Sequence, residues 1–315
     1  MELLAYAAFF LTVAMTYATI CLGLNVQWGQ TGLFNVGVAA FVGLGAYVSA
    51  ILTTPEAPGR LGGLGLPIAA GWVGAALAGG VLALLVGALT IRLRSDYLAI
   101  ATFGVAVALQ LVFQNAEPLT GGAFGIGFIP RPFGGLQRQA LPFAALNLAL
   151  TVALVLILYL ALERLAQSPW GRALRAVRED ETAAESLGKS PLRLRLEAFV
   201  LGGMVMALAG AVQAHFIGFI APANYLPALT FQVWAMLILG GSGNNRGAIL
   251  GAVVVWAIWA ATAALIAHLV PAGEQARASS LQLVAIGVIL CAVLLWRPQG
   301  LLPERRAVPR HLGRP

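Results

Sequence analysis

Charge is distributed very unevenly along this 315-residue chain. Between residues 1 and 55 the only charged side chain is that of Glu2, whereas residues 163–197 hold 13 of the chain's charged residues. A charged side chain at the centre of a bilayer costs about 2.5 to 3.5 kcal/mol on insertion scales. The chain therefore contains long segments that can enter a membrane, and residues 163–197 form a segment that must lie outside it.

Composition places the chain among integral membrane proteins, since 60% of its residues are hydrophobic and 10% are charged, against about 25% charged in soluble domains. A membrane-spanning helix needs about 20 apolar residues. Candidate runs lie at 3–24, 33–53, 66–89, 97–115, 143–162, 198–219, 228–240, 248–269 and 281–296. We predict an all-α, polytopic bundle of about nine spans, between eight and ten, as a single transmembrane domain over residues 1–315.

Two glycine-rich regions, 23–45 and 240–251, do not resemble ordinary spans. The first also carries Asn25, Gln27 and Asn35 in an apolar context. Irregular backbone at membrane depth is tolerated where it lines a cavity or is buried in protein, so broken or re-entrant helices are expected here. For Gly243, Gly247 and Gly251, spaced by four, close helix packing is favoured over substrate contact.

Basic residues indicate the orientation. Nine spans place the loop with Arg92 and Arg94, residues 163–197 and the basic tail 297–315 on the same side. Cytoplasmic loops carry the excess of Lys and Arg, so the N-terminus is expected outside and the C-terminus in the cytoplasm. The net charge of +7 follows from these loops and gives no reason to predict nucleic-acid binding.

No catalytic, metal-binding or cofactor motif is found in the sequence. Gly188-Lys189-Ser190 resembles the end of a P-loop, but position 183 is Ala where that motif requires Gly. The two cysteines and three histidines are far apart, which favours neither a disulfide framework nor a metal site. His215 falls inside a candidate span, where simple burial near the membrane interface is favoured over a functional role.

The charged segment is patterned as a helix over residues 170–188. Ser168 and Pro169 are typical of an N-cap and first helical position, and Gly188 is typical of a helix end. In one continuous helix, Leu174, Val177, Ala184 and Leu187 can share a face, together with Ala173. The helix is either a solvated interfacial helix or a docking helix for a cytoplasmic partner, and periodicity does not separate the two.

The sequence resembles the branched-chain amino acid ABC-transporter permeases of the LivM type over nearly its whole length. The segments that carry the resemblance, in order, include LGLNVQWGQTGLFNVGVAAF from residue 22, LRSDYLAIATFGVAVALQLVFQN from 93, SPWGRALRAVREDETAAESLGKSPLRLRLEAF from 168, LGGSGNNRGAILGA from 239 and WRPQGL from 296.

This resemblance implies a non-enzymatic permease of a bacterial inner membrane that imports branched-chain amino acids. The implied partners are two cytoplasmic ATP-binding subunits, a second homologous permease and an extracytoplasmic substrate-binding protein. A cytoplasmic coupling loop at 163–197 is expected to contact the ATPases; Ala183, Ala184 and Gly188 keep the E-A-A-x-x-x-G pattern of such loops, while Thr182 replaces its Glu. The expected ATPase-coupling residues are Arg172, Arg175, Glu181, Ala183, Ala184 and Gly188.

The expected residues of the translocation pathway are Asn25, Gln27, Gly32, Asn35, Gly37 and Gln110. Three other functions remain open. A permease for urea or short amides would look similar in sequence. A gradient-driven transporter or channel would carry acidic residues in mid-span, and an enzyme acting on lipid would need a nucleophile with a base or a metal. Neither feature is visible.

Overall fold

The structure is a computed structural model that describes residues 2–56, 59–269 and 299–304, together with positions 271, 274, 284, 287, 288, 291, 292 and 295. Within this part of the chain every regular element is a helix. The one β pairing there is an isolated bridge between Ile126 and Ile220. The expectation of an all-α protein is therefore confirmed for the described residues.

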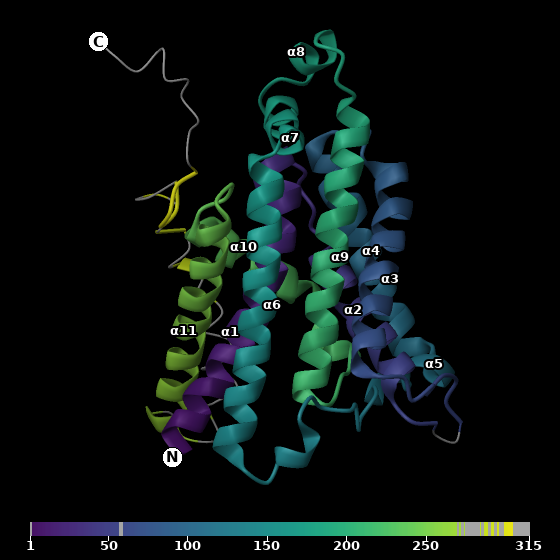
Figure 1. The fold of residues 1–315 in the computed structure, drawn as a ribbon, viewed down its shortest axis with the longest axis vertical. Coiled ribbons are helices and arrows are strands. Elements are labelled where there is room, and N and C mark those ends of the chain that lie inside the picture. The colour runs from purple at the N-terminus through teal and green to yellow at the C-terminus, as the bar shows by residue number, and fades with distance from the viewer. Residues whose placement is uncertain are drawn as a thin grey trace.

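The long helices run side by side in an elongated bundle (Figure 1). In chain order the described elements are α1 (Glu2–Thr31), α2 (Val38–Thr53), α3 (Ile68–Thr90), α4 (Ser95–Asn115), α5 (Glu117–Thr120), η1 (Gly122–Phe124), η2 (Gly134–Leu136), α6 (Ala140–Gln167), α7 (Pro169–Glu179), α8 (Glu181–Ser186), α9 (Pro191–Ile217), η3 (Pro222–Tyr225), α10 (Pro227–Gly240) and α11 (Asn245–Leu269).

Six of these helices, α1, α3, α4, α6, α9 and α11, are long and apolar enough to cross a membrane. The apolar helices α2 and α10 have only 16 and 14 residues. Helices of that length cover about 21 to 24 Å, less than the roughly 30 Å of a bilayer's hydrocarbon core. The predicted span at 281–296 lies outside the described residues apart from single positions. A multi-pass helical bundle is confirmed, and the number nine stays a prediction.

The first helix is longer than the sequence indicated. α1 continues through Asn25, Gln27 and Gly29 to Thr31 without interruption, so these residues do not lie in a broken helix. The chain leaves the helix at Gly32, whose φ of +71° is a left-handed conformation that favours glycine. The interruption predicted for residues 23–45 is thus confined to residues 32–37, which connect α1 to α2.

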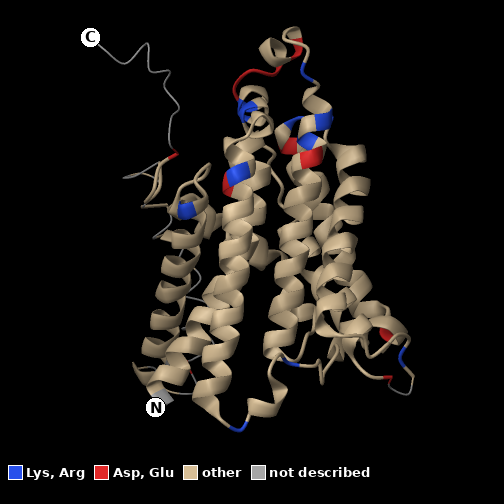
Figure 2. Cartoon of the chain, in the orientation of Figure 1, with Lys and Arg blue, Asp and Glu red and all other residues tan. Residues whose placement is uncertain are grey.

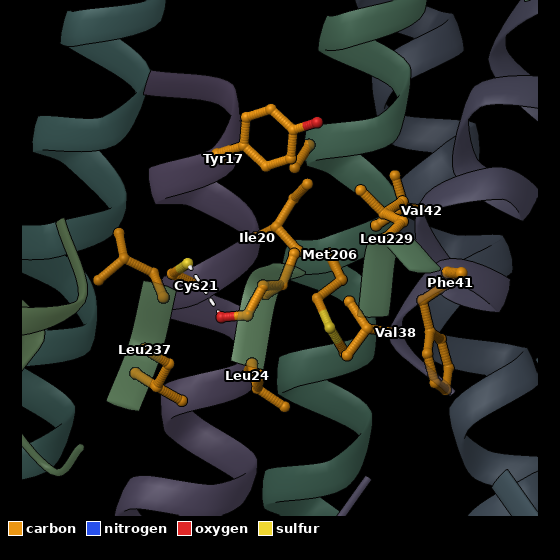
Figure 3. Packing of buried hydrophobic residues seen from close by; sticks show 14 of the residues in the cluster. Tyr17, Ile20, Cys21, Leu24, Val38, Phe41, Val42, Met206, Leu229 and Leu237 are labelled. Carbon is orange, nitrogen blue, oxygen red and sulfur yellow. Dashed lines mark hydrogen bonds between the residues drawn. The ribbon is translucent and has the colours of Figure 1, made fainter. Parts of the chain in front are cut away.

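The core lies where α1, α2, α9 and α10 meet, and Figure 3 shows side chains from these helices packed against one another. Glycines allow the backbones of α2 and α9 to approach closely. An added Cβ at Gly45 would lie 1.9 Å from the carbonyl oxygen of Ala207, and one at Gly210 would lie 2.0 Å from that of Val42. Only glycine fits at such crossings.

The second glycine-rich region joins α10 to α11. Gly247 and Gly251 lie within the regular helix α11, and an added Cβ at Gly251 would lie 2.0 Å from the carbonyl oxygen of Met236. At Gly247 the corresponding distance to the carbonyl oxygen of Gly240 is 2.6 Å. The packing interpretation is confirmed for these two glycines, and the irregular backbone is limited to residues 241–244.

Charged side chains gather at the end of the bundle that carries α7 and α8, with fewer at the opposite end (Figure 2). The middle of the described bundle shows none in that view. This separation is what a bundle that crosses a membrane requires, because hydrocarbon does not solvate charge.

Candidate functional site

The candidate site is residues 168–190, at the charged end of the bundle, which we call the coupling segment after its predicted role. Its start follows the sequence prediction, since Pro169 is the first residue of α7 and the Ser168 hydroxyl accepts a hydrogen bond from the Gly171 amide at 3.4 Å. The turn from α6 into α7 is tight. A Cβ added to Gly171 would lie 2.2 Å from the carbonyl oxygen of Ala166.

The prediction of one continuous helix over 170–188 is wrong, because the segment breaks at Asp180. This residue is extended, with φ −151° and ψ 106°, and its carboxylate accepts a hydrogen bond from the Ala183 amide at 2.9 Å. Asp competes with the helical backbone for such bonds and is a preferred N-cap. The predicted helix end is confirmed at Gly188, which has a φ of +73°.

α7 is held firmly against the bundle. Gly171, Leu174 and Val177 form its buried face. At its start, the indole N–H of Trp170 donates a 2.8 Å hydrogen bond to Oε2 of Glu197 on α9. These contacts fix α7 to the long helices over its whole length.

The arginines of α7 differ in direction. Arg175 reaches inward, where its Nη1 donates to Oε1 of Gln30 on α1 at 3.1 Å and to the Ala166 carbonyl at 3.0 Å. Arg172 is exposed and donates to the carbonyl of Gln167, the last residue of α6. Arg178, which sequence reasoning did not select, donates to the Gly29 carbonyl and to Glu304.

α8 is attached more lightly. Ala184 is 2% exposed and is covered by this chain, whereas Ala183 is exposed. Oε2 of Glu181 lies 2.8 Å from Nη1 of Arg195 on α9. Leu187 is 78% exposed. It does not share the buried face with Leu174, because the break at Asp180 interrupts the helical register that the sequence prediction assumed.

A cavity of 520 Å³ separates α8 from the turn between α3 and α4. Charged side chains line one part of it, and glycine and apolar residues line the rest; the lining includes Arg92, Arg94, Glu181, Glu185 and Arg195 as well as Gly32, Leu33 and Leu98. On this side α8 is therefore not packed against the turn between α3 and α4.

The polar residues predicted for a pathway form a buried network around the interruption at 32–37. Nε2 of Gln27 donates to the Phe199 carbonyl at 2.8 Å, and Nδ2 of Asn35 donates to Oε1 of Gln27 at 2.7 Å. The Gly37 amide donates to Oδ1 of Asn35 at 2.7 Å, and the indole N–H of Trp234 donates to the Asn35 carbonyl at 2.9 Å. The bonds to the Gly37 amide and the Asn35 carbonyl satisfy backbone groups of the interruption that lie outside any helix.

A second polar group joins the helices at the same end. Nδ2 of Asn25 donates to Oδ1 of Asn245 at 2.9 Å, and the Gly243 amide donates to Oδ1 of Asn25 at 2.8 Å. Asn245 in turn donates to Oε2 of Glu163 on α6 at 2.9 Å. The structure therefore brings Asn25 to the turn between α10 and α11, while Gln27 and Asn35 meet each other.

Of the remaining predicted pathway residues, Gln110 lies apart, whereas Gly32 and Gly37 lie in the interruption at 32–37. Gln110 is half-buried in α4 and does not belong to either polar group. Gly37 is buried, and a Cβ there would lie 2.6 Å from the carbonyl oxygen of Thr102. Gly32 faces Arg178, whose Cγ would lie 3.3 Å from an added Cβ.

His215 is fully buried between the hydroxyl of Ser49 at 2.8 Å and the carbonyl of Pro130 at 2.7 Å.

Comparison with known sequences identifies the family. Residues 6–294 match the family model described as the permease component of branched-chain amino acid transport systems. The chain belongs to this family. The permease is 33% identical to the high-affinity branched-chain amino acid transport system permease protein LivM of Escherichia coli K12, over 94% of this chain and 69% of that protein.

Two further relatives show the breadth of the similarity. The permease is 26% identical to the probable branched-chain amino acid transport permease protein LivM of Methanocaldococcus jannaschii, over 92% of this chain and 91% of that protein. It is 27% identical to the permease protein LivH of Salmonella typhimurium, over 78% of this chain and 80% of that protein. No solved structure matches the chain.

Proposed function

We propose that this permease is the LivM-type membrane subunit of an ABC importer for branched-chain amino acids. The proposal rests on its family and on relatives named for branched-chain amino acid transport over most of their length. Its N-terminus lies outside the cell and its C-terminus in the cytoplasm. The charged end with α7 and α8 then faces the cytoplasm, as the excess of basic residues there requires.

The coupling segment docks an ATPase subunit chiefly through α8. The observation that carries this assignment is Leu187, a large apolar side chain that is 78% exposed at the tip of the charged end. Exposed Ala183 lies one helical turn before it. Protein interfaces typically bury an apolar core inside a polar rim. Glu181, Ala184 and Gly188 shape α8 for that contact.

The importer also contains a second permease and an extracytoplasmic binding protein. We place the second permease against α4, whose exposed side chains include Ile100, Leu111 and Val112. The translocation pathway runs along this contact, with Gln110 as its polar residue on this chain.

The connection between α1 and α2 lets the bundle change its packing. It is formed by Asn25, Gln27 and Asn35 together with Gly32 and Gly37.

Transport follows from two packings of the same helices. ATP closes the two ATPase subunits, which moves the docked segments, and the attached helices open the pathway alternately to each side. The permease contributes no bond-breaking chemistry. It provides two arrangements whose relative stability depends on the ATPases and on the loaded binding protein.

Coupling to an ion gradient is disfavoured by the position of acidic side chains. Within the described long helices, Asp96, Glu163 and Glu197 lie in the first or last two turns, next to the charged end. A proton- or sodium-coupled transporter commonly holds such residues in mid-span. ATP hydrolysis by partner subunits therefore fits this chain better.

Copurification tests the docking assignment. The complex is purified with its ATPases from cells that express wild-type permease, Leu187→Glu or Ala183→Trp. We expect both variants to lose the ATPase subunits, because burying an unpaired carboxylate or overfilling a fitted contact destabilises an interface. Leu61→Glu is the matched control: Leu61 is 65% exposed and lies in the loop between α2 and α3. Retention of both ATPases by both docking variants would show that α8 is only a solvated helix.

Uptake assays test the substrate. Proteoliposomes that contain the complete complex and its binding protein are supplied with ATP and radiolabelled leucine or urea. We expect leucine uptake that stops when ATP is omitted. Urea uptake in place of leucine uptake would assign the amide-transporting alternative.

A further inference from the structure

Arg178 joins three segments that are far apart in the sequence. It lies on α7, one residue before its end, and its side chain is partly buried. Its Nη1 donates to the carbonyl oxygen of Gly29 in the last turn of α1. Its Nη2 donates to both carboxylate oxygens of Glu304, at 2.9 Å to Oε2 and 3.1 Å to Oε1.

The Gly29 carbonyl is a natural acceptor for this guanidinium. The last four carbonyls of a helix have no partner within the helix, and α1 ends two residues later at Thr31. The C-terminus of a helix also carries partial negative charge that favours a cation. Next to it, Arg175 holds Gln30, so α7 binds the end of α1 at two adjacent residues.

Glu304 is presented by a short strap, which we define as residues 300–304. The Leu301 and Leu302 amides donate to the carbonyls of Leu239 and Gly240 at 2.8 and 2.9 Å. On the other side, Nδ2 of Asn244 donates to the Pro303 carbonyl at 3.1 Å. The strap is thus fixed to the end of α10 and to the turn before α11.

We propose that Arg178 is a positioning residue for transport, which transmits displacement of α7 to the end of α1 while the strap holds its guanidinium in place. The proposal rests on the proposed docking of the coupling segment. If α7 moved alone, the guanidinium and the Glu304 carboxylate would lose their partners in a partly buried site, which is costly. The end of α1 therefore moves with α7. α1 in turn is largely buried in the bundle from Thr12 to Thr31.

The test measures coupling, not activity alone. Complexes in proteoliposomes are assayed for ATP hydrolysis and for leucine uptake in the same sample. Arg178→Gln should keep the ATPases and continue to hydrolyse ATP, while leucine transported per ATP falls about tenfold, the scale expected for a lost charge-assisted hydrogen bond. Glu304→Gln should lower the ratio in the same direction by a smaller factor, because Gly29 still holds the guanidinium.

Arg193→Gln is the matched control. Arg193 also pairs with a glutamate at 2.8 Å, but within α9 and with an exposed side chain, so the ratio should equal that of the wild type. Charge exchange gives a second readout: Arg178→Glu should uncouple transport, and adding Glu304→Arg should restore part of the ratio. Where Arg178 variants do not fold, Glu304→Gln decides the question.

Three results would overturn the proposal. An unchanged ratio in Arg178→Gln would show that α1 does not follow α7 through this residue. Loss of the ATPases from Arg178→Gln complexes would place the residue in docking instead. If Arg178→Gln does not fold, an unchanged ratio of leucine transported per ATP in Glu304→Gln would also reject the proposal. Failure of the docking assignment differs from all of these, since it appears as ATPases retained by the Leu187 and Ala183 variants.

Discussion

α7 and α8 are neighbours in sequence, but the bundle holds them in opposite ways. α7 buries Leu174 and Val177 and sends two arginines onto the end of α1. α8 contacts the bundle through Ala184 and one ion pair, and it leaves Leu187 in solvent. The coupling segment thus divides at Asp180 into an anchor, α7, that packs on the long helices, and a lightly attached helix, α8, which is the proposed contact surface for a partner.

The largest expected difference between the two helices is at their leucines. Leu174 is 0% exposed, and its replacement by Ala should cost about 2 to 5 kcal/mol of stability through lost contacts and a cavity. Leu187→Ala should change stability by no more than about 0.5 kcal/mol, as for most exposed positions. Thermal unfolding of the purified permease in detergent measures both. Equal shifts in Tm would contradict the division.

Glycines give the next comparison. Gly171→Asn should lower the free energy of unfolding by about 3 kcal/mol, the upper part of the range for overpacking. The reason is that a Cβ at position 171 has no room beside the Ala166 carbonyl. Gly188→Asn should cost less than about 1 kcal/mol, since Asn tolerates a left-handed conformation and no atom lies within 4 Å of an added Cβ there. The same unfolding assay decides, and a costly Gly188→Asn would show that α8 is packed after all.

The start and end of the coupling segment were predictable from the sequence, and its internal contacts were not. Ser168, Pro169 and Gly188 carry local signals, and the structure confirms them as the start and end of the segment. The break at Asp180 was missed because acidic residues are also compatible with a continuing helix. The partners of Arg178 could not be predicted, since Glu304 lies 126 positions away along the chain.

The same contrast holds in the glycine-rich region after α1. Polar residues in an apolar run predicted irregular backbone in this region, and residues 32–37 are irregular. Sequence could not show that Gln27 and Asn35 bond to each other, because hydrogen-bond direction depends on how α1 turns into α2. Nor could it show that α1 ends at Thr31, since an apolar helix and an apolar loop have similar composition.

Tryptophan substitutions test the attachment of α7 to α9. Trp170→Phe removes the N–H that donates to Glu197. The free energy of unfolding should fall by about 1.5 to 3 kcal/mol, as for hydrogen bonds to charged groups. Trp72→Phe is the control, because its indole N–H has no hydrogen-bond partner in the described structure. If both variants unfold at the same temperature, the bond to Glu197 does not hold the anchor.

The smallest expected effect concerns the ion pair between Glu181 and Arg195, which ties α8 to α9. The Glu181 side chain is 47% exposed, so a double-mutant cycle with Glu181→Gln and Arg195→Gln should give a coupling energy of about 1 kcal/mol or less. Because solvent ions screen such pairs, the energy should shrink in 1 M salt, where the Debye length is about 3 Å. A weak pair lets α8 shift over the cavity beside it when a partner binds. A coupling energy of several kcal/mol that resists salt would make α8 as fixed as α7, and docking on it would then move the whole bundle directly, without a separate role for the anchor.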